Sequence, residues 1–360
     1  MDSGATDQGR RQLLAGRQLR GEGLPGLLAA LGPAQRLGPG HGLHPLRPQS
    51  PGAAGGIGNA VGRDPDRAVT GKACTAIRSE PLDFQHILYS TDGPLGVITL
   101  NRPSRRNAQG YRMLDELEQA FELARRDEAV RVVILRGSDG VFSTGHDLGT
   151  PEEVEYRKAL GAKPGIQTYD QFKHYNLDLL VRWRNFPKPT IAMIEGYCIY
   201  AGWMLAAAMD VVFAADDAEF LAGFVEYMSI PWDIGVRRAK ELCFESRFIS
   251  AQEAAAYGLV NRVLAPADLE RETYAWARRV AENSPEALRL AKIQMNKAQD
   301  AQGFTQALED SLGDYQAMLH MPGSQHRMEG ERRLHTVDLA VRGKRGERFG
   351  LAPTRPKESS

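Results

Sequence analysis

The sequence reads Gly196-Tyr-Cys-Ile-Tyr-Ala-Gly-Trp-Met-Leu-Ala-Ala-Ala-Met-Asp210 directly after a short β-branched run, Thr190 to Ile194. Small residues stand where this predicted strand must turn into a helix. A second segment, Phe142-Ser-Thr-Gly-His-Asp-Leu148, follows the run Val130 to Leu135 in the same way. Two strand-to-turn junctions of this kind can aim backbone N–H groups at one point, as an oxyanion hole requires. The pair predicts thioester or other acyl chemistry and leaves the reaction open.

The pattern around these two segments is that of a globular α/β protein, from Phe84 to about Leu319. Apolar and β-branched runs predict strands at 95–100, 130–136, 190–194 and 211–215. Helical periodicity predicts helices at 107–126, 169–183, 203–209, 251–257, 266–281, 285–297 and 304–319. Strands alternate with helices first and helices follow alone at the end. This order predicts an α/β core over 83–265 and a C-terminal helical subdomain over 266–320.

Both ends of the chain differ from this core in composition. Residues 1–82 are rich in Gly, Pro and Arg and have no aromatic residue, so they predict a disordered extension. An organellar transit peptide and a basic nucleic-acid-binding tail are the alternatives for this stretch. Residues 321–360 predict a polar, basic tail.

Overall charge and cysteine usage narrow the class of protein. The formal net charge is +0, which favours neither a nucleic-acid nor a membrane partner. The 3 Cys residues have no metal-ligand spacing, so no metal site is predicted. No apolar run is long enough for a membrane span and no secretory signal is recognised. We expect a cytoplasmic protein.

Four segments resemble the enoyl-CoA hydratase/isomerase (crotonase) superfamily, over roughly residues 84 to 320. Thr99-Leu-Asn-Arg-Pro-Ser-Arg-Arg-Asn-Ala108 resembles its early strand–turn signature, and Phe142 to Leu148 resembles its F-x-x-G-x-D loop. Lys188-Pro-Thr-Ile-Ala-Met-Ile-Glu-Gly-Tyr197 resembles its K-P-x-I-A-x-x-x-G-Y strand. Ser250-Ala-Gln-Glu-Ala-Ala-Ala-Tyr-Gly-Leu-Val-Asn-Arg-Val263 resembles a late block of the family. The four occur in the family's order.

The resemblance implies a crotonase-like spiral of ββα units, assembled as homotrimers or hexamers. It implies an acyl-CoA thioester as substrate and no other cofactor. The thioester oxygen would be held by the backbone N–H groups of His146 and Ala201. Gly145, Asp147 and Leu148 would line the substrate site beside the first of these amides.

The sequence departs from the family at the residues that move protons. The two glutamates of the family's hydratases fall on Met204 and Phe224, which here would only line the substrate site. Neither side chain can transfer a proton, so hydration by the usual pair of carboxylates is not expected.

Two other carboxylates are the candidate proton carriers. Asp233 lies in Ser229-Ile-Pro-Trp-Asp-Ile-Gly235, which resembles the V-P-D-x-G turn of family isomerases with Trp232 inserted. Apolar neighbours, among them Trp232, would raise the pKa of this carboxyl. The alternative for Asp233 is to cap the turn. Glu226 is the second candidate, because period-2 alternation in an extended segment would place it on the same face as Phe224.

Further residues could complete the site. The imidazole of His146 is a possible acid or base, and Tyr169, His174 and Tyr175 are on a helix that could cover the acyl pocket. The CoA phosphates could be bound by the cationic side chains of Arg102, Arg105, Arg106 and Lys188. The family segment after Gly235 is shortened here, which would reshape the acyl pocket.

The leading hypothesis is enoyl-CoA double-bond isomerisation, because one carboxylate can take and return the same proton. Enoyl-CoA hydration or C–C or ring-opening hydrolysis with a rearranged site is the closest alternative. A non-catalytic acyl-CoA-binding subunit and RNA binding through the basic tails belong to other classes of function.

Overall fold

The protein is described by a computed structural model that defines residues 83–321 and 336–345. The predictions for 1–82, and those for the rest of the C-terminal segment, lie outside these ranges. No helix within the described ranges has the length and apolar character needed to cross a membrane.

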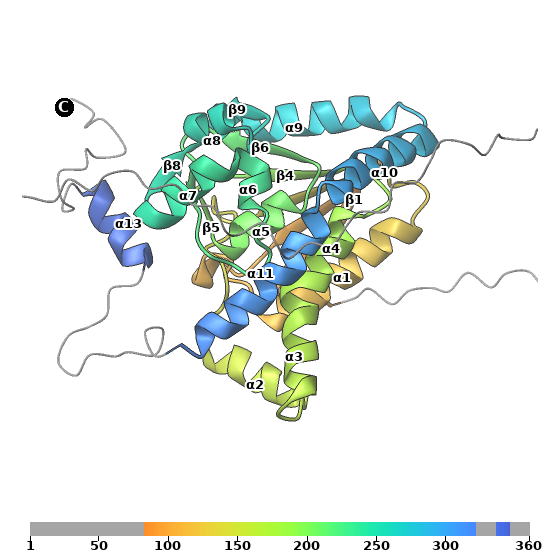
Figure 1. The fold of residues 1–360 in the computed structure, drawn as a ribbon. Coiled ribbons are helices and arrows are strands. Elements are labelled where there is room, and N and C mark those ends of the chain that lie inside the picture. The colour runs from red at the N-terminus through yellow and green to blue at the C-terminus, as the bar shows by residue number, and fades with distance from the viewer. Residues whose placement is uncertain (1–82, 322–335, 346–360) are drawn as a thin grey trace, which may run out of the picture. The chain divides into compact units, whose positions relative to one another are not determined.

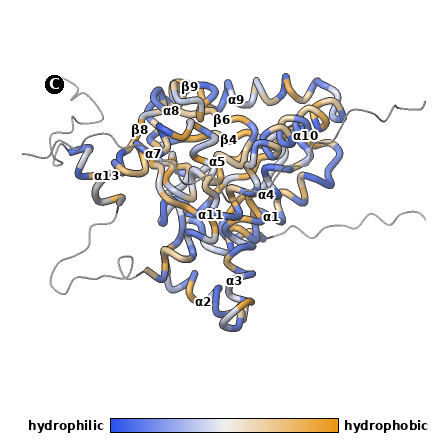
Figure 2. Tube along the Cα trace, viewed as in Figure 1, coloured by the Kyte–Doolittle hydropathy of each residue, from blue (hydrophilic) through white to orange (hydrophobic). Residues whose placement is uncertain are grey.

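A six-stranded sheet forms the centre of the fold, in the order β1-β2-β3-β4-β6-β9. β1 runs antiparallel to β2, and all other neighbours are parallel. The strands are β1 (Ile87–Asp92), β2 (Leu95–Leu100), β3 (Val132–Gly137), β4 (Thr190–Ile194), β6 (Val211–Ala215) and β9 (Arg262–Leu264). β4 is buried along its whole length, as expected for a strand covered on both faces. Figure 2 shows the apolar residues of β4 and β6 inside the surrounding helices.

A second, three-stranded sheet has the order β5-β7-β8. It contains β5 (Tyr197–Ile199), β7 (Glu219–Leu221) and β8 (Phe248–Ser250). The chain passes from the large sheet to the small one twice, through β4 to β5 and through β6 to β7. This repeated strand–strand–helix course is the predicted spiral of ββα units, so the predicted fold class is confirmed.

The helices pack around the two sheets (Figure 1). α9 crosses β2, β3, β4 and β6, while α1 lies against β1 and β2. In chain order they are η1 (Pro103–Arg105), α1 (Tyr111–Arg126), α2 (Pro151–Ala159), α3 (Ile166–Lys173), η2 (His174–Asp178), α4 (Leu179–Arg184), α5 (Ala201–Ala207), α6 (Ile230–Ile234), α7 (Val236–Glu245), α8 (Ala251–Tyr257), α9 (Pro266–Ala281), α10 (Pro285–Ala301), α11 (Phe304–Leu319) and α13 (Thr336–Lys344).

The amphipathic pattern of α1 shows how the sequence makes these packings. Spacings of three and four residues place Leu114, Leu117, Phe121 and Ala124 on one face of the helix, and all four are buried. Phe121 stacks on Trp183 of α4, with ring centroids 5.4 Å apart. The helix predicted over 169–183 is present as α3, η2 and α4 in succession. Its middle turn, η2, is a π-helix, a rare geometry that is frequent at functional sites.

The segment 321–360, which the sequence predicts as a polar, basic tail, contains a helix, α13, over residues 336–344. Ala340 is buried against Ile199, Leu221 and Phe248 of the small sheet. Lys344 forms an ion pair with Glu219 of β7. Spacings of three and four residues place Val337, Ala340, Val341 and Lys344 on the docked face.

Candidate active site

Backbone hydrogen bonds hold the two glycine-containing turns side by side. Phe142 N–H donates to the carbonyl of Glu195, and Ser143 N–H donates to that of Tyr197. Ile199 N–H donates back to the carbonyl of Ser143. The chain before His146 therefore extends the small sheet at β5, which leads straight to Ala201.

Gly145 and Gly202 allow the close approach between these turns. The φ of Gly145, +94°, is a conformation that favours glycine, and a methyl group built on it would lie 3.0 Å from the carbonyl oxygen of Ile199. Space is tighter at Gly202, where a methyl group would lie 2.6 Å from the carbonyl oxygen of Ser143. Two glycines, one on each turn, thus set the spacing of the candidate oxyanion hole.

The peptide groups of Gln109 orient the amide of His146. Gln109 N–H donates to the Gly145 carbonyl, and Asp147 N–H donates to the Gln109 carbonyl, as in a parallel bridge. In that pattern the bonds go to the residues on either side of His146, so its own N–H points away from Gln109. Ala201 is the first residue of α5, where a backbone N–H has no partner within the helix. The bridge to Gln109 therefore does not use the His146 N–H, and α5 does not use the Ala201 N–H.

Strained backbone precedes the second amide. Tyr200, the N-cap of α5, has φ 48° and ψ −105°, which is unusual for a residue with a side chain. Its ring lies against Gly223, where a methyl group would be 2.3 Å from the Tyr200 Cε1 atom. The loop after β7 therefore packs directly on the residue that carries the turn.

The same loop brings Glu226 to the candidate hole. Glu226 is buried, and its Oε2 lies 3.3 Å from Nε2 of His146. Period-2 alternation does not explain this position, because β7 ends at Leu221 and the loop is irregular. Phe224 is 42% exposed, whereas Glu226 is buried.

Two tyrosines that sequence reasoning did not place in the site lie near Glu226. Burial raises the pKa of Tyr315 on α11, and the charge of Glu226 raises that pKa further. Burial also raises the pKa of Tyr111, and Glu226 adds to the effect. Tyr111 stacks on Tyr175 of η2 with centroids 3.9 Å apart. Neither Tyr111 nor Tyr315 belongs to a short motif that could have signalled this role.

Asp233 has a different environment from Glu226. Its Oδ2 accepts hydrogen bonds from Trp203 Nε1 at 2.9 Å and from Ser229 Oγ at 2.8 Å. Burial raises the pKa of this carboxyl, and the two hydrogen bonds offset part of that rise. The contacts join α6 to α5, so they fit the alternative reading of Asp233 as a residue that fixes its turn.

The remaining apolar candidates occupy separate places. Met204 is buried in the core and Leu148 is 89% exposed. Trp232 packs on Phe304 and lines a groove of about 650 Å³ between α6 and α11, together with Met228, Pro231 and Val236. This groove lies where the segment after Gly235 is short.

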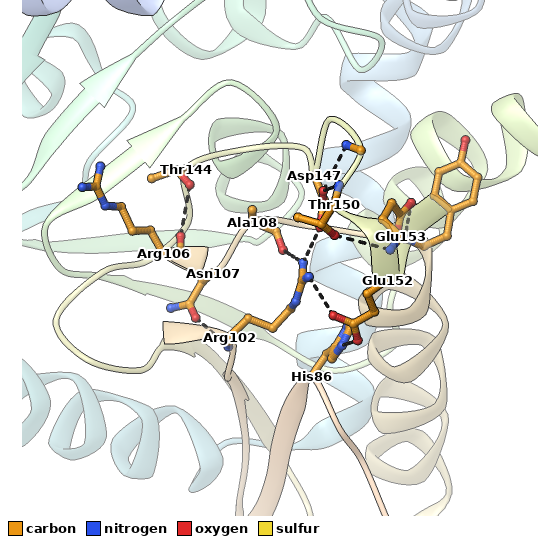
Figure 3. A network of polar contacts seen from close by, with 12 residues as sticks. His86, Arg102, Arg106, Asn107, Ala108, Thr144, Asp147, Thr150, Glu152 and Glu153 are labelled. Carbon is orange, nitrogen blue, oxygen red and sulfur yellow. Dashed lines mark hydrogen bonds and ion pairs between the residues drawn. The ribbon is translucent and has the colours of Figure 1, made fainter. Parts of the chain in front are cut away.

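Asp147 is bound within its own loop (Figure 3). Its carboxylate accepts hydrogen bonds from Thr150, Gly149 and Arg102. Burial raises its pKa, but these bonds outweigh burial and lower the pKa to about 2. Arg102 is itself buried and also pairs with Glu152, which in turn contacts His86. Asp147 therefore stabilises the turn that carries His146.

The four cations expected near CoA phosphates separate into two groups. Arg102 is committed to the network of Figure 3, and Lys188 donates to the carbonyls of Ala124 and Asp127. Burial lowers the pKa of Lys188. Arg105 and Arg106 are exposed, and the Arg106 side chain points away from the network. The Arg106 carbonyl accepts the backbone N–H of Thr144, so these two arginines flank the turn.

The helix expected to cover the pocket contributes unequally. Tyr175 is buried and donates to Asp115 on α1, with Oδ2 at 2.9 Å. His174 makes an edge contact with the Tyr175 ring, and Tyr169 is 39% exposed. Only Tyr175 touches residues that lie beside Glu226.

Comparison with known proteins identifies the family of the chain. The family model described as "Enoyl-CoA hydratase/isomerase" matches residues 91–333. EchA13 of Mycobacterium tuberculosis strain H37Rv, whose name assigns it provisionally to the enoyl-CoA hydratases, is 39% identical over 252 residues, covering 64% of this chain and 79% of that protein.

Solved structures show the same relationship. A probable enoyl-CoA hydratase from Mycobacterium smegmatis is 37% identical with a TM-score of 0.56, covering 63% of this chain and 92% of that one. An enoyl-CoA hydratase/isomerase from Xanthobacter autotrophicus Py2 is 34% identical with a TM-score of 0.58, covering 64% and 86%. The chain belongs to the enoyl-CoA hydratase/isomerase family.

Proposed function

We propose that this enzyme shifts the double bond of an enoyl-CoA, with Glu226 as its single proton carrier. The observation that carries the proposal is the 3.3 Å contact between Glu226 Oε2 and His146 Nε2. It places one buried carboxylate beside the residue whose amide forms half of the candidate hole. The Oδ2 atom of Asp233, the first candidate from the sequence, instead accepts hydrogen bonds from Trp203 and Ser229.

The reaction needs one base and one anion site. Glu226 takes a proton from C2 of a 3-enoyl thioester, and the C2–H electrons move into an enolate whose oxygen accepts from the N–H groups of His146 and Ala201. The protonated Glu226 then returns the proton to C4, and the double bond comes to rest between C2 and C3. Two fixed donors of this kind are each worth roughly 10²–10³ in rate in acyl-transfer enzymes.

Hydration is the second candidate, because the imidazole of His146 is a further titratable group beside Glu226. The pair could activate a water molecule, which Met204 and Phe224 cannot do. The M. tuberculosis relative also carries the name of a hydratase. The two reactions differ in product mass, since hydration adds one water and isomerisation adds nothing.

Proton exchange at C2 tests the shared step without knowledge of the acyl group. Butanoyl-CoA incubated with the enzyme in D₂O should gain deuterium at C2, detected by mass spectrometry. A separate reaction with 3-hexenoyl-CoA in H₂O should give 2-hexenoyl-CoA of unchanged mass. Exchange that persists unchanged in Glu226→Gln would overturn the role of Glu226. A product heavier by one water would favour hydration, and tight binding of CoA esters without exchange would identify a non-catalytic subunit.

A further inference from the structure

Gly145, the residue before the His146 amide, is bound through both of its peptide groups. Its carbonyl accepts the backbone N–H of Gln109 at 2.8 Å, and its own N–H donates to Oγ of Ser143 at 3.2 Å. Glycine adopts its φ of +94° as readily as many other conformations, so the residue itself does little to fix these two peptide planes. The His146 N–H belongs to the second plane and, in a trans peptide, points opposite to the Gly145 carbonyl. Its direction therefore depends on contacts from outside the turn.

The side chain of Gln109 reaches the same turn by a second route. Its Nε2 donates to Ser143 Oγ at 2.9 Å, and that hydroxyl donates to the carbonyl of Asn107 at 2.8 Å. Gln109 thus contacts the turn with its main chain, at Gly145, and with its side chain, at Ser143. One residue holds both peptide planes of the glycine, the first through the Ser143 hydroxyl and the second directly.

The donors and acceptors around the Ser143 hydroxyl determine which group Gln109 must present. The single hydroxyl proton goes to the Asn107 carbonyl, which can only accept, so the oxygen accepts from the Gly145 N–H and from Gln109. The Gln109 carbonyl oxygen could not take this place, because it would face a lone pair. Ser143 and Gln109 are 0% and 3% exposed, so a lost partner would leave a buried group unsatisfied. Gln109 is therefore required here as a donor.

Asn107 gives this network a fixed end. It is fully buried, and its Oδ1 accepts the backbone N–H of Arg102 at 2.9 Å (Figure 3). Its Nδ2 donates to the carbonyls of Ser138 and Val141, at 3.1 and 2.6 Å. Asn107 thus joins the segment after β2 to the segment after β3. The Ser143 hydroxyl is bound to the carbonyl of a residue that is itself held from both sides.

We propose that Gln109 is the positioning residue of the first oxyanion donor: acting through Ser143, its side chain fixes the peptide planes around Gly145 and aims the His146 N–H at the thioester oxygen. The inference rests on the proposed function, since it takes the His146 amide as half of the hole. A hydrogen bond weakens steeply when it is misaligned, and this one matters most when negative charge develops on the oxygen. Gln109 therefore acts on the rate of enolate formation and contributes little to binding of the CoA ester.

Gln109→Met tests this role, because it keeps the length of the side chain and removes the donor. Deuterium exchange into butanoyl-CoA should slow about 5- to 20-fold in kcat with KM nearly unchanged, as for the loss of one buried hydrogen bond behind the donor. The infrared band of the carbon-labelled thioester carbonyl in bound butanoyl-CoA should move back toward its position in free solution. Thr273→Val on α9 is the matched control, because it removes a buried hydroxyl that donates to the Leu269 carbonyl at 2.7 Å. It should leave kcat and the carbonyl band unchanged.

Gln109→Glu separates the donor from the space that the side chain fills. The introduced carboxylate cannot donate to Ser143 while it is ionised, whereas the protonated form can. Burial raises the pKa of a carboxyl, so the exchange rate relative to wild type should rise as the pH falls from about 9 to about 6. A ratio that stays constant over this range would overturn the role of Gln109 as a donor.

The infrared measurement also separates this inference from the proposed function. If the carbonyl band of butanoyl-CoA on the wild-type enzyme matches that of the free ester, the two-amide hole itself is refuted. If the wild-type band is displaced and Gln109→Met changes neither the band nor kcat, the hole stands and the positioning role of Gln109 is refuted. Equal changes in Gln109→Met and Thr273→Val would also count against Gln109.

Discussion

Arg102 donates from Nη1 to Oδ2 of Asp147 at 2.9 Å, and both side chains are almost fully buried. The pair joins the end of β2 to the turn that carries the His146 amide. The sequence predicts a different role for each of these two segments, CoA binding for one and part of the substrate site for the other. In the fold both of them stabilise the turn at His146.

Removal of the arginine should therefore destabilise the protein. Arg102→Met leaves the Asp147 charge buried without its ion-pair partner, and we expect the free energy of unfolding to fall by about 3 kcal/mol in urea titration. Arg125→Met is the control, since Arg125 pairs with Glu122 at the surface and its loss should leave the free energy of unfolding nearly unchanged. Equal effects of the two changes would show that burial of the Arg102 pair adds nothing.

Asp147 should make stability depend on pH in acid. Its folded-state pKa of about 2 lies below the ordinary value, so the carboxylate adds stability that is complete above about pH 4 and is lost as the pH falls toward 2. In Asp147→Asn this part of the acid dependence, on the order of 2 kcal/mol, should vanish. Urea titrations at pH 5 and pH 3 measure the difference. An unchanged slope in the variant would contradict the assignment.

The two candidate carboxylates should differ in their effect on turnover. Glu226→Gln is expected to lower the rate of C2 proton exchange at least ~10²-fold, as for loss of a positioned acid–base group. Asp233→Asn keeps an oxygen that can accept from Trp203 and Ser229, so exchange should stay within a few-fold of the wild type. Its Tm should also hold or rise, because burial raises the Asp233 pKa and the charged form is the costly one. The reverse order of the two effects would restore Asp233 as the carrier.

Gly202→Ala should disrupt the spacing of the two amides. The added methyl group would meet the Ser143 carbonyl oxygen at 2.6 Å, so α5 must move away from the first turn. We expect kcat for exchange to fall about 10²-fold, which is the loss seen when one oxyanion donor is removed. Gly313→Ala on α11 offers a control at a position with open space. Thermal unfolding should show that both variants fold, and full activity in Gly202→Ala would refute the two-amide arrangement.

Truncation before Thr336 should weaken the small sheet. It uncovers Ile199, Leu221 and Phe248 and removes the partner of Glu219. A few buried apolar contacts of this size should lower Tm by several degrees, on the order of 1–2 kcal/mol. Lys344→Ala in the full chain should give a smaller decrease. A truncated protein with the Tm of the full chain would show that α13 adds no stability.

The sequence predicted the parts of the fold that local periodicity encodes. β2, β4 and β6 and the helices α8, α9 and α11 have the predicted bounds, because each combines a clear apolar pattern with a turn or Pro at its start. α13 escaped prediction because its docked face ends in Lys344, whose charge hides the stripe. A basic residue that pairs with Glu219 looks like part of a tail until its partner is seen.

The candidate site was less accessible to sequence reasoning. The two turns carry their own small residues, so local signals were enough to predict a candidate hole there. The contact between Glu226 and His146 could not be predicted, because the two residues lie in segments far apart in the chain with no motif to join them. Arg102 shows a further limit of sequence reasoning. An arginine that binds a phosphate and an arginine that pairs with a buried Asp147 cannot be told apart from the sequence alone.

The contact between Tyr200 and Gly223 couples the position of the Ala201 amide to the position of Glu226. The ring that meets Gly223 belongs to the residue just before the Ala201 amide, and the Gly223 loop runs on to Glu226. A side chain at 223 would displace the Tyr200 ring, the loop, or both. We therefore expect a substitution at this position to shift the candidate oxyanion donor and the proposed proton carrier relative to each other.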